Sequence, residues 1–189
     1  MFILYAVIAG VIVGLVSGGS PSRLGDLRIK WGSLIALGMA SQVLLFSTPI
    51  GNLLGDGAAL VYIASNVAVL GAVATNLAIP GLGFVLAGGA SNMLAILANG
   101  GYMPVSTDAL AAMGRLPKEG YSNSVPRTDV VLGPLTDIFT MPAWAPMANV
   151  FSIGDILIGV GAGVAIVAAM HGRGPLAPRI SPPARSTAA

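Results

Sequence analysis

The sequence predicts an all-α integral membrane protein, a helical bundle of about five transmembrane helices with one long extracytoplasmic loop. The first observation is composition: 55% of the 189 residues are hydrophobic and only 8% are charged, whereas a water-soluble domain carries about 25% charged residues. The second is the length of the apolar stretches, several of which approach the roughly 20 residues that a helix needs to cross a bilayer. The chain also contains no cysteine, which excludes disulfides, thiolate metal sites and iron–sulfur clusters.

Five apolar stretches are the expected spans, and they lie near residues 2–17, 33–49, 58–76, 81–98 and 152–170. The first has no basic residue before its apolar run, which distinguishes it from a secretory signal peptide. These spans define a membrane domain at residues 1–170, whose outer loop occupies residues 99–151. A tail rich in proline and arginine follows at residues 171–189.

The distribution of basic residues predicts the orientation, because short cytoplasmic loops are enriched in lysine and arginine. The loop after the first span contains Arg23, Arg28 and Lys30, and the tail contains His171, Arg173, Arg179 and Arg185. With five spans these two segments fall on the same side of the membrane. We therefore expect a multi-pass membrane protein with its N-terminus out and its C-terminus in.

Glycines recur at intervals of four in the first and last spans, as Gly10 and Gly14 and again as Gly159 and Gly163. This spacing places small residues on one helix face and lets helix backbones approach closely in lipid. The alternative is that glycine is simply common in membrane helices.

The outer loop opens with Asn99, Gly100 and Gly101, and a glycine just past a helix end can adopt the left-handed conformation that closes the helix. Ser106 or Thr107 is then expected to cap a short helix that extends through Met113. The apolar, proline-punctuated segment 130–151 is expected to lie on the membrane interface or over the helix ends. A lid over a ligand is the alternative for a loop of this length.

The fifth span opens with Ser152 and Asp155, which have the spacing of a capping box. An acid in a membrane helix is also a candidate for proton or ion transfer, so the cap and the ion site are competing interpretations. Amide side chains within or beside the spans are expected to join helices through hydrogen bonds; they are Gln42, Asn66, Asn76 and Asn92.

Catalytic chemistry has little support in this sequence. His171 is the only histidine, and the chain has no paired-acid site, phosphate-binding loop or HExxH motif. We expect no catalytic residue, no metal site and no cofactor, although His171 as a single axial ligand to a haem or chlorophyll-type pigment is an alternative. Nine basic and seven acidic residues are too few and too scattered for a nucleic-acid-binding surface.

Two motifs carry a resemblance to a known family. Residues 99–106 read NGGYMPVS, with Met103 and Pro104 at their centre, and residues 150–155 read VFSIGD. With these motifs the chain resembles an uncharacterised family of small bacterial multi-pass membrane proteins, known as a domain of unknown function. The resemblance extends over about residues 1–170. It implies a fold and a location in the bacterial inner (plasma) membrane, and no activity.

Two functions follow as hypotheses. The first is a non-enzymatic accessory or scaffold subunit of a larger bacterial membrane complex, for example a respiratory or photosynthetic one. Its partners would be the lipid bilayer and other membrane protein subunits. The alternative is a small transporter or channel that uses Asp155, Asn66 and Asn92. An integral-membrane enzyme acting on lipids ranks third.

Overall fold

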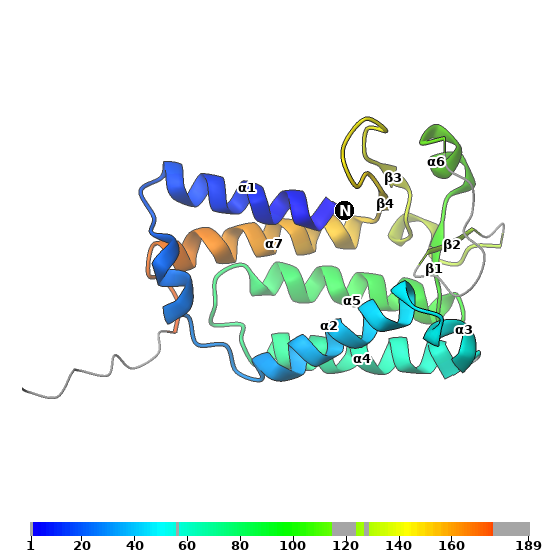
Figure 1. Cartoon of the computed structure of the whole chain (residues 1–189), viewed down its shortest axis with the longest axis horizontal. Helices are drawn as coiled ribbons and strands as arrows, with labels where there is room; N and C mark the ends of the chain where they lie inside the picture. The colour runs from blue at the N-terminus through cyan, green and yellow to red at the C-terminus, as the bar shows by residue number, and fades with distance from the viewer. Residues whose placement is uncertain (1, 56, 115–123, 127–128, 176–189) are drawn as a thin grey trace, which may run out of the picture.

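The computed structural model describes residues 2–55, 57–114, 124–126 and 129–175, and the chain is mostly helical. Five long helices lie lengthwise beside one another (Figure 1). They are α1 (Phe2–Val16), α2 (Gly32–Ser47), α4 (Gly57–Ala74), α5 (Leu82–Ala98) and α7 (Ile153–Met170). Each begins and ends close to one of the five predicted apolar stretches.

Two of these helices, α4 and α7, are long and apolar enough to cross a membrane, with 18 residues each. The helices α1, α2 and α5 are apolar but shorter, at 15, 16 and 17 residues. Within the described residues the structure thus gives two candidate spans, and the five-span arrangement stays a prediction.

The helices run between two ends of the bundle (Figure 1). One end carries the 3₁₀ helix η1 (Pro21–Asp26) and the last described residues, and we call it the η1 end. The other carries α3 (Ile50–Leu54), α6 (Thr107–Ala112) and four short strands, and we call it the sheet end. The chain crosses from one end to the other in each successive long helix, so α1 and α7 run parallel.

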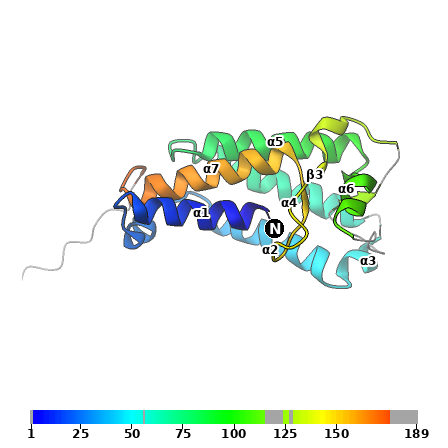
Figure 2. The same cartoon turned by 90° about the horizontal axis from the view of Figure 1, so that it is seen from above.

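The helix α7 lies between α1 and α5, and α4 packs on α5 and α2 on α4 (Figures 1 and 2). At the η1 end the Ser20 amide donates to the Met170 carbonyl at 2.8 Å. At the sheet end the Phe2 amide donates to the Asn149 side chain at 2.9 Å. These bonds fasten α1 to α7 and its flanking segment at both ends.

Glycines set how closely α1 approaches α7. A Cβ atom built on Gly10 would lie 2.8 Å from the Cα atom of Gly163, and one on Gly159 would lie 2.9 Å from the Cβ atom of Ala6. Gly14 faces the side chain of Met170. The four glycines expected to pack helices therefore all lie along the α1–α7 interface.

A second glycine face of α7, which the sequence analysis missed, packs on α5. A Cβ atom on Gly161 would lie 2.8 Å from the backbone nitrogen of Val85, and Gly154 faces Asn92 and the backbone of Gly88. Gly154 and Gly161 are seven residues apart, which is two helical turns and hence one face. That spacing is the signal that could have revealed this interface.

The predicted outer loop contains short strands besides the expected short helix α6, so the chain is mostly helical rather than all-α. Strand β1 (Met103–Val105) pairs in parallel with β2 (Ser124–Pro126), and β3 (Phe139–Thr140) pairs antiparallel with β4 (Val150–Phe151). Strands of two or three residues are too short to produce an alternating pattern that could be recognised. A second 3₁₀ helix, η2 (Gly133–Leu135), lies between β2 and β3.

The short connection expected after the second span also differs, because it contains the helix α3. Pro49 precedes this helix with φ −63°, a value that suits the start of a helix. Of the predicted tail, the structure describes residues 171–175. Residues 176–189, with Arg179 and Arg185, lie outside the described residues.

The glycine contacts predict that replacing glycine by alanine changes the stability differently at two helical positions. Gly10→Ala places a methyl group against the backbone of Gly163, and we expect it to destabilise the protein by about 1–3 kcal/mol, as overpacking does. Gly71 in α4 has no atom within 4 Å of a built Cβ, so Gly71→Ala is expected to be neutral or to stabilise by up to about 1 kcal/mol. Thermal unfolding in detergent measures both. Equal effects of the two variants would show that Gly10 has no special packing role.

Candidate functional site

The NGGYMPVS segment begins by closing α5. Gly100 and Gly101 both have left-handed backbones, with φ of 74° and 90°. The Gly101 amide donates to the Ile96 carbonyl at 2.9 Å and the Gly100 amide to the Leu97 carbonyl at 3.4 Å. These are the two bonds of a Schellman motif, in which a glycine just after the helix satisfies the last carbonyls.

Asn99 connects this turn to the rest of the sheet end. Its side chain is 3% exposed. The amide nitrogen donates to the carbonyls of Val131 and Ala95 at 2.8 and 2.7 Å, and the side-chain oxygen accepts from the Val131 amide at 2.9 Å. Asn99 therefore holds a distant backbone segment much as a neighbouring strand would.

The rest of the segment lies inside the protein. Met103 belongs to a buried cluster contributed by α2, α4, α5 and β1; its other members are Leu45, Ala58, Tyr62, Ala95 and Ile96. The Pro104 carbonyl accepts from the Asp137 amide at 3.0 Å, and the Ser106 amide donates to the Asp137 carbonyl at 2.9 Å. The Ser106 hydroxyl caps α6 by accepting from the Ala109 amide at 3.2 Å. This geometry gives the motif a structural role, joining the sheet end to the helices.

Ser152 and Asp155 form a capping box at the start of α7. The Asp155 amide donates to the Ser152 hydroxyl at 3.0 Å, and the Ser152 amide donates to the Asp155 carboxylate at 3.4 Å. Asn92 of α5 completes the group: it donates to the Asp155 carboxylate at 2.9 Å and accepts from the Ser152 hydroxyl at 2.8 Å. The cap is thus also a polar bridge between α5 and α7.

The other polar residues predicted in the spans lie apart from this group. Gln42 of α2 donates to Ser65 of α4 at 3.2 Å, which is the expected bond between helices. Asn66 donates to the Tyr62 carbonyl of its own helix at 2.8 Å. Asn76 accepts from the Lys30 amide and donates to the Lys30 carbonyl, both at 2.8 Å. Among the described contacts, none brings Asn66 to Asn92 or Asp155.

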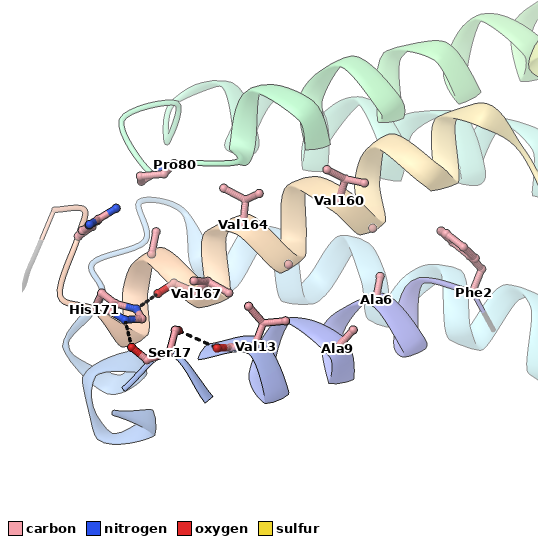
Figure 3. Close-up of a pocket in the computed structure, with 15 residues that line it drawn as sticks. Phe2, Ala6, Ala9, Val13, Ser17, Pro80, Val160, Val164, Val167 and His171 are labelled. Carbon is pink, nitrogen blue, oxygen red and sulfur yellow. Dashed lines mark hydrogen bonds between the residues drawn. The ribbon is translucent and has the colours of Figure 1, made fainter. Parts of the chain in front are cut away.

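An apolar groove of about 740 Å³ runs along α1 and α7 (Figure 3). It extends from Phe2 at the sheet end to His171 and Arg173 at the η1 end. Between these ends it is lined mainly by small and β-branched residues, among them Ala9, Gly10, Val13, Gly163, Val164 and Val167. No local sequence pattern indicates this groove, because its walls come mainly from two helices far apart along the chain.

His171 closes the η1 end of the groove (Figure 3). Its Nδ1 atom lies 2.9 Å from the Val167 carbonyl oxygen and its Nε2 atom lies 3.1 Å from the Ser17 carbonyl oxygen. Carbonyl oxygens only accept, so both contacts are hydrogen bonds at once only when both ring nitrogens carry protons. No group of three or more His, Asp or Glu side chains suited to a metal ion occurs among the described residues.

Comparison with protein families shows the family to which this chain belongs. A family model matches residues 26–167, which is most of the sequence. The chain belongs to the family of unknown function DUF5317. The DUF5317 match is narrower than the expected range of about 1–170, since it begins within η1 and leaves out α1. Searches of the curated proteins and of the solved structures give no match.

The polar bridge at the start of α7 generates a prediction that separates a cap from an ion site. Asp155→Asn retains one of the two oxygens that accept hydrogen bonds from Asn92 and the Ser152 amide, so we expect this variant to stay folded and to lose less stability than a variant without the cap. Replacing both Ser152 and Asp155 by Ala removes the cap and is expected to lower the free energy of unfolding by about 1–2 kcal/mol. Chemical denaturation in detergent measures the difference.

The matched control for this test is Ser41→Ala, since the Ser41 hydroxyl donates to the Gly38 carbonyl of its own helix. It is expected to cost less than the double variant. A folded Asp155→Asn protein that loses a proton or ion flux in proteoliposomes would overturn the structural interpretation.

Proposed function

We propose that this DUF5317 protein is a non-enzymatic membrane protein of five spans, an accessory or scaffold subunit of a larger complex in the bacterial inner membrane. The observation that carries the proposal is the apolar surface of all five long helices. Exposed apolar side chains on them include Ile12, Leu37, Val43, Leu60, Val67, Phe84, Leu94 and Val160. Apolar surface of this extent marks contact with lipid or with other proteins.

The burial of the two longest helices supports the same proposal. Only 28% of α4 and 33% of α7 is buried, whereas the core helix of a soluble protein is mostly buried. The three shorter helices are compatible with crossing, because a bilayer thins locally around a short hydrophobic stretch.

The two tryptophans also support a membrane location. Trp31 precedes α2 at the η1 end and is 65% exposed, while Trp144 lies between β3 and β4 at the sheet end and is 85% exposed. Tryptophan is enriched at both membrane–water interfaces. One exposed tryptophan at each end fits a bundle whose long axis crosses the bilayer.

Charge supports the proposed orientation. The η1 end gathers Arg23, Arg28 and Lys30 with Arg173, and a surplus of basic residues favours the cytoplasmic side. The sheet end would then lie outside, with the N-terminus of α1. This arrangement is N-terminus out and C-terminus in.

The hydrogen bonds of the polar residues favour a scaffold over a transporter or channel. Asp155 and Asn92 take part in the cap of α7, and Asn66 bonds within α4. A solute path would need such groups to line one common passage. The described residues offer instead tightly packed interfaces between α7 and its two neighbours.

The topology is tested with reporter fusions. Fusions after Lys30 and after Arg173 are expected to report a cytoplasmic location, because clustered basic residues resist translocation. A fusion near Lys118, between α6 and β2 in the sequence, is expected to report export. A cytoplasmic signal at Lys118 contradicts the five-span proposal.

The accessory role is tested by purification from the native host in mild detergent. We expect the protein to co-migrate with other membrane subunits in native gels, and a His171→Ala variant to co-migrate equally. The matched comparison is Gly10→Leu, which disturbs the α1–α7 interface and is expected to weaken the association. A solitary parent protein that conducts ions in proteoliposomes would favour the transporter alternative instead.

A further inference from the structure

We propose that the groove between α1 and α7 binds one anionic phospholipid, with an acyl chain along the two helices and the phosphate group at the His171 and Arg173 end. This inference rests on the proposed membrane insertion. It adds a ligand of defined chemistry to the accessory role.

The apolar part of the groove suits a flexible hydrocarbon chain. Gly10, Gly159 and Gly163 line the groove and also hold α1 close to α7, so the groove follows the line where these two helices meet. Val13 and Val164 lie along it and are 54% and 40% exposed. An acyl chain laid in this groove would cover apolar surface that the protein itself leaves open.

The charge at the η1 end suits a phosphate group. Arg173 and His171 line the groove there, and no acidic residue does. The Arg23 side chain lies beside Gly172, since its Nη1 atom is 3.5 Å from a Cβ built on that glycine. Within the described part of the chain, neither Arg23 nor Arg173 has an acidic partner. The guanidinium groups of Arg23 and Arg173 therefore lie where the apolar groove ends.

The helix ends alone would repel an anion, because α1 and α7 both terminate here and their last carbonyls carry partial negative charge. His171 covers two of these carbonyls, those of Val167 and Ser17. The guanidinium groups of Arg23 and Arg173 supply positive charge at this point.

The position of the η1 end agrees with the side of the membrane that supplies anionic lipid. In the proposed orientation the η1 end faces the cytoplasm, where the membrane surface is negative, and basic pockets between transmembrane helices on that side bind acidic headgroups. An anionic phospholipid combines the two properties that the groove presents, a long apolar chain and a terminal anion. Free phosphate would use only the second.

The test measures thermal unfolding of the purified full-length protein in an uncharged detergent. Three additions are compared: phosphatidylglycerol, phosphatidylcholine with the same acyl chains, and inorganic phosphate. We expect phosphatidylglycerol to raise the unfolding temperature by several degrees, phosphatidylcholine to raise it less, and inorganic phosphate to leave it unchanged.

Two matched pairs of variants locate the site. Val13→Trp fills the groove and is expected to abolish the phosphatidylglycerol effect. Ile12→Trp is expected to leave the phosphatidylglycerol effect intact, because Ile12 lies outside the groove. It is a matched control, since Ile12 is 53% exposed and Val13 is 54% exposed. Arg173→Gln is expected to remove the preference for phosphatidylglycerol over phosphatidylcholine, while Arg28→Gln at the same end keeps it. The arginine pair leaves the apolar walls unchanged, so it tests the charge independently of the tryptophan pair.

Three outcomes overturn the inference. If phosphatidylglycerol and phosphatidylcholine raised the unfolding temperature equally, the headgroup charge would play no part. If inorganic phosphate raised it as much as phosphatidylglycerol does, the groove would play no part. Identical behaviour of Val13→Trp and Ile12→Trp would place the lipid elsewhere. None of these outcomes changes the reporter-fusion result, so failure of the lipid site and failure of the five-span proposal are distinguishable.

Discussion

The close approach of α7 to its two neighbours is the constraint on which the rest of the structure depends. Gly10 and Gly163 bring α1 against one face of α7, and Gly154 and Gly161 bring α5 against another. Helices packed at such short distances gain dispersion contacts along their whole length. In lipid, where no hydrophobic force drives helices together, this packing is a main source of association.

Asparagine side chains attach loops to the ends of the helices through hydrogen bonds. Asn99 holds Val131 and Asn76 holds Lys30, each through both its oxygen and its nitrogen. Asn149 accepts from the Phe2 amide. A buried backbone group without a partner costs about 1–3 kcal/mol. These side chains supply partners where the chain is too irregular to pair with itself.

Much of the helical fold was predictable, because long apolar runs and caps are local signals. The five long helices follow the apolar stretches, and the cap at Ser152 and Asp155 follows from a spacing of three residues. The short strands and α3 were not predictable, since each is fixed by contacts with distant segments rather than by its own pattern. The role of Asn149 was missed for the same reason, because nothing near it in the sequence indicates that its partner is Phe2. The groove could not be predicted, because it exists only once α1 and α7 lie side by side.

The parallel arrangement of α1 and α7 has a consequence for the order of assembly. The ribosome makes α1 first and α7 last among the long helices, and domains generally form in the order in which they are synthesised. The glycine face of α1 therefore has no partner in α7 until α2, α4 and α5 have been made. During that interval Gly10 and Gly14 remain uncovered by α7. The contact that completes the bundle thus joins the first and the last of the long helices.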